Sequence, residues 1–128
     1  MGRCRILLVE DEPLMRFLHE RLLIDFGCIV DTASNAEEAL SLQGKYYDFI
    51  LLDIGLLGMS GIELAEVLQR TLHPKTRLIG LTAYTDNQTL ERCLETGIEL
   101  VLHKPVDLDY LRSLINTKTL SIAEEVPP

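Results

Sequence analysis

The sequence predicts a single α/β domain in which helices cover both faces of a parallel β-sheet. Short apolar runs alternate with longer segments of helical periodicity along the whole chain. These runs lack the alternation of polar residues that marks a strand with one wet face, so we expect strands buried on both sides. With 128 residues, 47% of them hydrophobic, the chain can bury a core without disulfides.

Five segments have the composition of buried strands. Each is short, contains several Leu, Ile or Val residues, and is followed by residues that favour turns or helix starts. The predicted strands are Cys4–Val9, Cys28–Thr32, Asp48–Leu52, Arg77–Leu81 and Ile98–His103.

Five segments between and after the strands show helical periodicity. Pro13 suits the first position of the first helix, and Gly27 ends it. One side of this helix carries Leu14, Phe17, Leu18 and Leu22. The other helices are expected from Ser34 or Asn35 to Gln43, from Ile62 to Leu72, from Asp86 to about Glu95, and from Asp107 to about Thr117. We expect residues 3–118 to form the domain and residues 119–128 to be a linker or frayed tail.

Strands that alternate with helices pair in parallel, because each helix returns the chain to the same end of the sheet. Right-handed crossovers then leave few topologies. We expect the flavodoxin-like doubly wound (βα)5 arrangement, with strand order 2-1-3-4-5. Ligands of such sheets bind outside the carboxyl ends of the strands, where the strand order reverses between the first and third strands.

Polar residues stand directly after four of the predicted strands. Glu10 and Asp11 follow the first strand, Asp53 the third, Thr82 the fourth and Lys104 the fifth. Because the carboxyl ends of parallel strands meet at one edge of the sheet, we expect these five side chains to converge on one crevice.

The three acids of this group predict a metal site. Two carboxylates about 4 Å apart repel by roughly 4 kcal/mol at an effective dielectric of about 20, so their pKa values rise or a cation lies between them. Carboxylates, a backbone carbonyl and water form the oxygen site that Mg²⁺ prefers, and Mn²⁺ takes similar ligands. A plainer role is expected for Glu12, since acids stabilise the start of a helix.

The remaining two residues predict anion binding beside the metal. Lys104 supplies a point charge with three donors, and Thr82 supplies a hydroxyl group. A metal, a lysine and a hydroxyl around one carboxylate are the components of phosphoryl transfer. We therefore predict that Asp53 acts as a nucleophile and forms an aspartyl phosphate.

Composition argues against several other classes. The 12 Lys and Arg residues face 20 Asp and Glu residues, giving a net charge of -8, so we expect no direct binding to nucleic acid. The apolar run Ile6 to Val9 is too short for a signal peptide or a membrane span. The three cysteines lack metal-ligand spacing and suit a reducing compartment, so we expect a cytoplasmic protein without membrane contact.

The motifs that contain these residues resemble those of receiver domains from two-component response regulators. The matches are VEDEP at the acidic pair, LLDIGLLGMSGIEL around Asp53, LTAY at Thr82 and HKP at Lys104. Gly61 stands at the position of the family's loop glycine. The resemblance covers about residues 3 to 118, and the chain is similar to the receivers of hybrid histidine kinases.

The resemblance implies how the metal and the acceptor are arranged. Asp53 would accept a phosphoryl group from a phosphohistidine in a Mg²⁺-dependent step. Asp11 and Asp53 would bind the metal directly, together with the backbone carbonyl of Gly55. Glu10 would act on the metal through water.

The resemblance also implies roles around the phosphoryl group. Thr82 and Lys104 would contact its oxygens, and the peptide bond before Pro105 would be cis and hold the loop of the lysine. Tyr84 would flank the phosphoryl group, where its ring could shield the acyl phosphate from water and slow hydrolysis.

Two departures from the family pattern stand out. Leu56 and Leu57 replace a pair that usually ends in proline, so with Gly55 beside them we expect a more flexible loop. Val101 replaces the Tyr or Phe of many regulators. A valine packs, but it cannot report a rotamer switch as an aromatic ring does.

We therefore predict a phosphoacceptor domain that relays or signals by protein contact and turns over no outside substrate. Its partner would be a histidine kinase or a histidine phosphotransfer domain. Formation of a weak homodimer is an alternative that the sequence leaves open. Relay within a hybrid kinase is favoured over a stand-alone single-domain regulator. A Mg²⁺-dependent aspartyl-phosphate phosphatase fits less well, because that class usually carries its nucleophile after the first strand. A nucleotide-binding or flavin-binding module would need a glycine-rich loop there.

In a relay protein the first helix would supply the docking surface, through Leu14, Met15 and Leu18. Helical periodicity predicts that most of this stripe, Leu14 and Leu18 included, packs in the core. Met15 is the better candidate for exposure.

Overall fold

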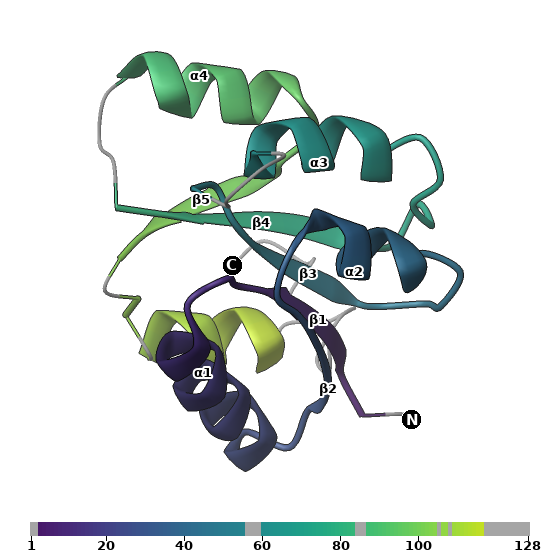
Figure 1. Ribbon diagram of the computed structural model, residues 1–128. Helices are drawn as coiled ribbons and strands as arrows, with labels where there is room; N and C mark the ends of the chain where they lie inside the picture. The colour runs from purple at the N-terminus through teal and green to yellow at the C-terminus, as the bar shows by residue number, and fades with distance from the viewer. Residues whose placement is uncertain (1–2, 56–59, 84–86, 105, 108, 117–128) are drawn as a thin grey trace, which may run out of the picture.

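The computed structural model describes residues 3–55, 60–83, 87–104, 106–107 and 109–116 and contains a five-stranded parallel sheet (Figure 1). The strands are β1 (Arg5–Val9), β2 (Ile29–Ala33), β3 (Phe49–Asp53), β4 (Arg77–Thr82) and β5 (Leu100–His103). Their order is β2-β1-β3-β4-β5, and every neighbouring pair is parallel. The predicted doubly wound topology is confirmed.

Helices cover both faces of this sheet. They are α1 (Pro13–Asp25), α2 (Ala36–Ser41), α3 (Gly61–Leu68), α4 (Asn87–Glu95) and a last helix over residues 109–116. Figure 1 shows α1 and the last helix on one face and α2, α3 and α4 on the other. No helix in these described ranges is long and apolar enough to cross a membrane.

Local signals explain where α1 begins and ends. The carboxylate of Glu12 accepts hydrogen bonds from the N–H groups of Leu14 at 3.3 Å and Met15 at 2.7 Å, and Pro13 follows as the first helical residue. The helix-start role expected of Glu12 is confirmed. Gly27 ends the segment with a φ of 94°, a left-handed conformation that side chains with a Cβ rarely adopt.

Two helices end earlier than predicted. The sequence suggested helix as far as Gln43 and Leu72, whereas α2 stops at Ser41 and α3 at Leu68. Beyond each helix the chain tightens into turns with three-residue hydrogen bonds, such as Thr71 N–H to the Leu68 carbonyl at 3.0 Å. Hydrophobic periodicity does not distinguish a regular last turn of an α-helix from a tighter turn that follows the helix.

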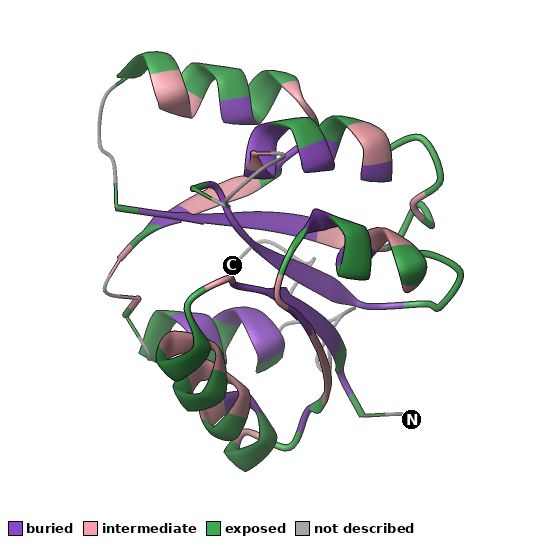
Figure 2. Ribbon diagram, in the orientation of Figure 1, coloured by how far each residue is buried: buried purple, intermediate pink, exposed green. Residues whose placement is uncertain are grey.

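The sheet separates two apolar clusters. The cluster under α2, α3 and α4 includes Leu7, Ile50 and Leu64, whereas the cluster under α1 and the last helix includes Ile6 and Phe49. Successive strand residues therefore enter opposite clusters, and β1 and β3 are buried along nearly their whole length (Figure 2). The cysteines at positions 4, 28 and 93 are buried in these clusters as thiols.

The apolar stripe of α1 does not lie in the core. Leu14 is 62% exposed, Phe17 57% and Leu18 45%, while Met15 is half-buried. The expectation that Leu14 and Leu18 pack in the core and that Met15 is more exposed is wrong. The physical reason is position, because α1 contacts β2 and β1 at one edge of the sheet and Leu23 is its one fully buried residue.

Candidate functional site

The strand register brings the predicted polar residues to one edge of the sheet. Val9 pairs with Leu52, which places Glu10, the next residue after β1, beside Asp53 at the end of β3. Asp53 and Thr82 are the last residues of their strands rather than the first residues after them.

The last two strands complete this edge. Thr82 pairs with His103, and the N–H of Lys104 donates to the Thr82 carbonyl at 2.8 Å. Thr82 is buried, at 2% exposure. The predicted convergence of five polar residues on the carboxyl ends of β1, β3, β4 and β5 is therefore observed.

Asp53 is buried, and both of its carboxylate oxygens have partners. Oδ1 accepts a hydrogen bond from the N–H of Gly55 at 3.0 Å. Oδ2 lies 3.3 Å from the ammonium nitrogen of Lys104. These two contacts fix the Asp53 carboxylate at the carboxyl end of β3.

Glu10 is more deeply buried than Asp53, at 1% exposure. Its Oε1 lies 3.1 Å from Lys104 Nζ, and its Oε2 accepts a hydrogen bond from the N–H of Glu12 at 3.3 Å. Burial raises the pKa of Glu10, the nearby Asp53 raises it further, and Lys104 opposes both effects.

Lys104 therefore bridges two carboxylates. Burial alone would lower the pKa of Lys104, but the charges and hydrogen bonds of Asp53 and Glu10 outweigh it and raise the pKa. The lysine stays protonated and acts as the counter-charge of the site. A cation held by two acids is also poised to exchange one of them for the oxygen of an anionic ligand.

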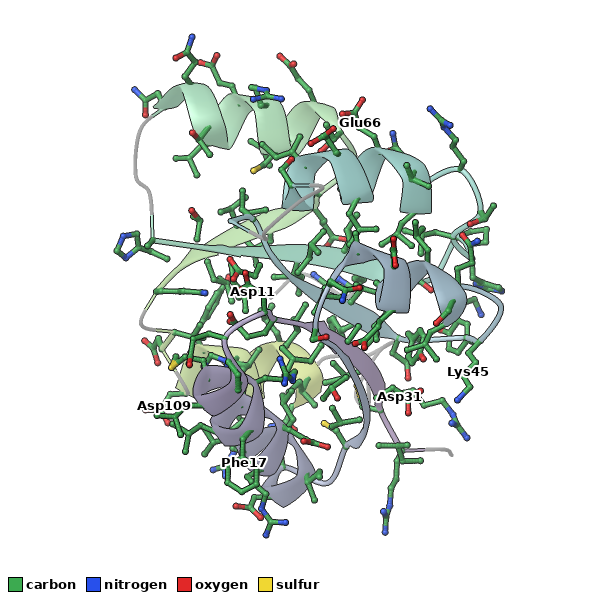
Figure 3. All side chains as sticks on the ribbon, in the orientation of Figure 1. Asp11, Phe17, Asp31, Lys45, Glu66 and Asp109 are labelled. Atoms are coloured by element: carbon green, nitrogen blue, oxygen red, sulfur yellow. The ribbon has the colours of Figure 1, made fainter. Side chains whose placement is uncertain are left out.

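Asp11 completes an acidic cluster with Glu10 and Asp53. One oxygen of each lies within 4.8 Å of the others, and within the described part of the chain this is the one group of acidic, histidine or cysteine residues with such spacing. Asp11 is half-buried at the point where the chain leaves β1 (Figure 3). Three hard oxygen donors without imidazole or thiolate suit Mg²⁺ or Mn²⁺ better than zinc.

Gly61, at the start of α3, allows the backbone to pass close behind Asp53. A Cβ atom at this position would contact the Asp53 carbonyl and would lie 2.6 Å from the Ile54 Cα. The N–H of Gly61 donates to the Ile54 carbonyl at 3.0 Å, and Ser60 and Glu63 cap the helix reciprocally. Glycine is thus required for α3 to start where it supports Asp53.

Val101 is half-buried and packs against the apolar cluster under α2, α3 and α4. This is the packing role expected of a valine. Its effect on signalling stays a prediction. The predictions for Tyr84, Pro105, Leu56 and Leu57 fall on residues outside the described ranges.

Sequence reasoning missed Arg16. Its Nη1 donates a hydrogen bond to the Glu10 carbonyl at 2.9 Å, directly beside the acidic cluster. The sequence does contain one signal for Arg16. It is a cation within the first turns of α1, where the helix dipole favours acidic residues instead.

Comparison with known proteins agrees with this geometry. A family model described as "Response regulator receiver domain" matches residues 6–116. The chain belongs to this family. A curated relative, a cyclic di-GMP phosphodiesterase of Thermotoga maritima, is 35% identical over 107 residues, which is 84% of this chain. The chain spans 28% of the length of that relative.

Solved structures of receivers are similar over nearly the whole chain. A CheY-like receiver domain protein from Methanospirillum hungatei is 28% identical, with a TM-score of 0.86 over 98% of this chain and 100% of that one. The receiver domain of a sensor histidine kinase from Pseudomonas aeruginosa, with magnesium coordinated in its active-site cleft, is 28% identical. Its TM-score is 0.78, over 90% of this chain and 96% of that one.

A third structure shows a modified receiver. A response regulator from Burkholderia pseudomallei, with a phosphorylated aspartic acid and a calcium ion, is 26% identical, with a TM-score of 0.81 over 95% of this chain and 73% of that one. As a receiver domain, the chain has a phosphoacceptor role in two-component signalling. Receivers are not classical enzymes that turn over an outside substrate.

Proposed function

We propose that Asp53 is the residue of this receiver that takes the phosphoryl group from a phosphohistidine. The observation that carries the proposal is the position of its carboxylate, between Lys104 at 3.3 Å and the oxygens of Glu10 and Asp11. A nucleophile beside a fixed cation and a metal-binding cluster has what phosphoryl transfer requires, namely positioning and charge neutralisation.

We propose that the acidic cluster holds Mg²⁺ or Mn²⁺. Asp11 and Asp53 would bind it directly with the carbonyl of Gly55, and Glu10 would act through water. The choice of cation rests on the oxygen-only donor set. When bound, the cation supplies charge neutralisation at the phosphoryl oxygens.

The residues of the chain carry out the rest of the step. One oxygen of Asp53 forms a bond to phosphorus while the bond from phosphorus to the histidine nitrogen of the donor breaks. The donor imidazole leaves with the electron pair and recovers its proton from solvent. Lys104 transfers its contact from Glu10 or Asp53 to a phosphoryl oxygen, and the Thr82 hydroxyl donates to another. Tyr84 would then slow hydrolysis of the acyl phosphate.

We further propose that the partner that donates or receives the phosphoryl group docks on α1. Leu14, Phe17 and Leu18 place apolar surface on the outer side of a helix that begins at the acidic cluster. Phe17 projects from this side (Figure 3). Such a surface suits a histidine phosphotransfer domain and favours relay over stand-alone signalling. Separately, the three thiols favour a cytoplasmic location for the protein.

The test of the acceptor is intact mass after incubation with acetyl phosphate and Mg²⁺. We expect one added phosphoryl group on the wild-type chain and none on Asp53→Asn or without a divalent cation. Asp31→Asn is the matched control, because Asp31 lies on the edge strand β2 and should leave modification intact. Modification that persists in Asp53→Asn would place the acceptor elsewhere, and an unmodified wild type would indicate a degenerate receiver.

A further inference from the structure

We propose that Arg16 is a positioning residue for the metal ligands, and that it acts by fixing the peptide bond between Glu10 and Asp11. The inference rests on the proposed metal site and adds a residue that touches neither the metal nor the phosphoryl group. The inference follows from the identity of the carbonyl group to which the Arg16 guanidinium donates a hydrogen bond.

The hydrogen bond of Arg16 falls on the peptide that joins two metal-site acids. Its Nη1 donates to the Glu10 carbonyl at 2.9 Å in a part-buried environment. A charge-assisted hydrogen bond of this kind is stronger than one between neutral groups. Rotation of this peptide would re-aim the side chain of Asp11, and the same rotation would break the bond to Arg16.

Glu10 is also held by other contacts, but these secure different parts of it. Its N–H donates to the Ala33 carbonyl at 3.0 Å, which continues the pairing of β1 with β2. Its carboxylate contacts Lys104, which is expected to turn toward the phosphoryl group. The contact with Arg16 secures the carbonyl of the peptide from which Asp11 extends, and phosphorylation need not disturb it.

Arg16 has a second anionic neighbour in Glu38, near the start of α2. Two hydrogen bonds from Ser34, at 2.6 Å from its N–H and 2.7 Å from its hydroxyl, lower the pKa of Glu38, and the charge of Arg16 lowers it slightly more. The charge of Glu38 therefore also attracts the Arg16 guanidinium group.

The positioning role and a simple charge effect predict opposite results. Removing a positive charge near a site for a divalent cation should tighten metal binding, because it removes repulsion. Removing a group that orients the ligands should weaken metal binding, typically by about 10-fold or more. The direction of the change in Mg²⁺ affinity of Arg16→Met therefore separates the two.

The experiment is calorimetric titration of Mg²⁺ into the wild type, Arg16→Met, Arg16→Lys and Arg21→Met, with thermal unfolding of each as a check on folding. We expect binding about 10-fold weaker in Arg16→Met. Arg16→Lys, which keeps the charge and part of the donor capacity, should show a smaller loss. Arg21→Met removes an exposed cation from the same helix and should bind as the wild type does.

Equal or tighter binding in folded Arg16→Met would overturn the inference. If that variant does not fold, Arg16→Lys decides, since binding equal to that of the wild type would overturn it as well. A wild-type chain that binds no Mg²⁺ would instead refute the proposed metal site, and this inference with it.

Discussion

The helices α1 and α3 both begin at the acidic site, yet they use their apolar residues in opposite ways. Of the 8 residues of α3, five are buried: Gly61, Ile62, Leu64, Ala65 and Leu68. Of the 13 residues of α1, Leu23 alone is buried. Figure 2 shows the contrast, with much of α1 exposed and the inner side of α3 buried. α3 packs against the sheet beside Asp53, while α1 leaves Leu14, Phe17 and Leu18 exposed in the part of the chain that the structure describes.

The difference follows from what each helix covers. α3 lies over an interior part of the sheet with α2 and α4 on the same face (Figure 1), and the capping box of Ser60 and Glu63 fixes its start. α1 lies toward the edge formed by β2. Exposed Leu and Phe side chains add little to the free energy of folding. They add favourable free energy to binding when a partner removes them from water. The proposed docking of a partner on α1 rests on this exposure.

The largest effect that tests this comparison concerns stability. Leu64→Ala in α3 deletes a fully buried side chain and should cost about 2–5 kcal/mol of the free energy of unfolding. Leu18→Ala makes the same chemical change on α1, where the side chain is 45% exposed, and should cost less than about 1 kcal/mol. Urea unfolding of both variants measures the two costs.

Leu18→Ala thus serves as the internal control for Leu64→Ala. Equal costs for the two variants would show that α1 is packed as tightly as α3. The proposal that its outer side awaits a partner would then lose its basis.

The next effect concerns the partner. Phe17→Ala should slow phosphoryl transfer from a phosphorylated histidine phosphotransfer domain by about 10-fold, because aromatic anchors dominate protein interfaces. Its labelling by acetyl phosphate should be unchanged, since the small donor needs no docking surface. Time courses of both reactions provide the measurement, with the phosphotransfer domain that modifies the wild-type chain as the donor.

Leu94→Ala is the matched control for Phe17→Ala. Leu94 is 56% exposed on α4, and Phe17 is 57% exposed on α1, so the two differ in location rather than in exposure. Slower transfer in Leu94→Ala alone would move the docking surface to α4.

The sheet and the positions of the polar residues at its edge could be predicted because both depend on patterns within short segments of the sequence. Strands buried on both faces have continuous apolar runs, and their parallel pairing brings every residue at a carboxyl end to one edge. Asp53, Thr82 and Lys104 were therefore found by their place after such runs. The boundaries of the predicted strands were less accurate, since Asp53 and Thr82 belong to their strands and β5 begins at Leu100 rather than at Ile98.

The exposure of α1 could not be predicted in this way. Periodicity shows that Leu14 and Leu18 share a side of a helix, but it does not show whether another element covers that side. Arg16 was missed for a related reason, because its bond to the Glu10 carbonyl depends on how α1 turns away from β1. Both are facts of packing between elements, which no single segment encodes.

The smallest effect concerns the inner side of α1, where His19 lies. Its imidazole is half-buried, and burial lowers its pKa, with a further lowering by the charge of Lys104. Above about pH 6.5 the histidine is neutral in both the folded and the unfolded chain, so pH has no effect through this residue. As pH falls below that value, the unfolded chain binds a proton that the folded chain does not, and stability decreases until the lowered pKa is passed.

The expected loss from His19 is at most about 1.4 kcal/mol per pH unit, and it can be measured by urea unfolding between about pH 7.5 and about pH 5.5. His19→Gln should flatten this slope, whereas His103→Gln, which removes an exposed histidine at the end of β5, should keep it. A slope unchanged in His19→Gln would mean that the inner side of α1 admits water as freely as its outer side. A flattened slope would show that the inner side of α1 is shielded from water, in contrast to the exposed outer side that carries Leu14, Phe17 and Leu18.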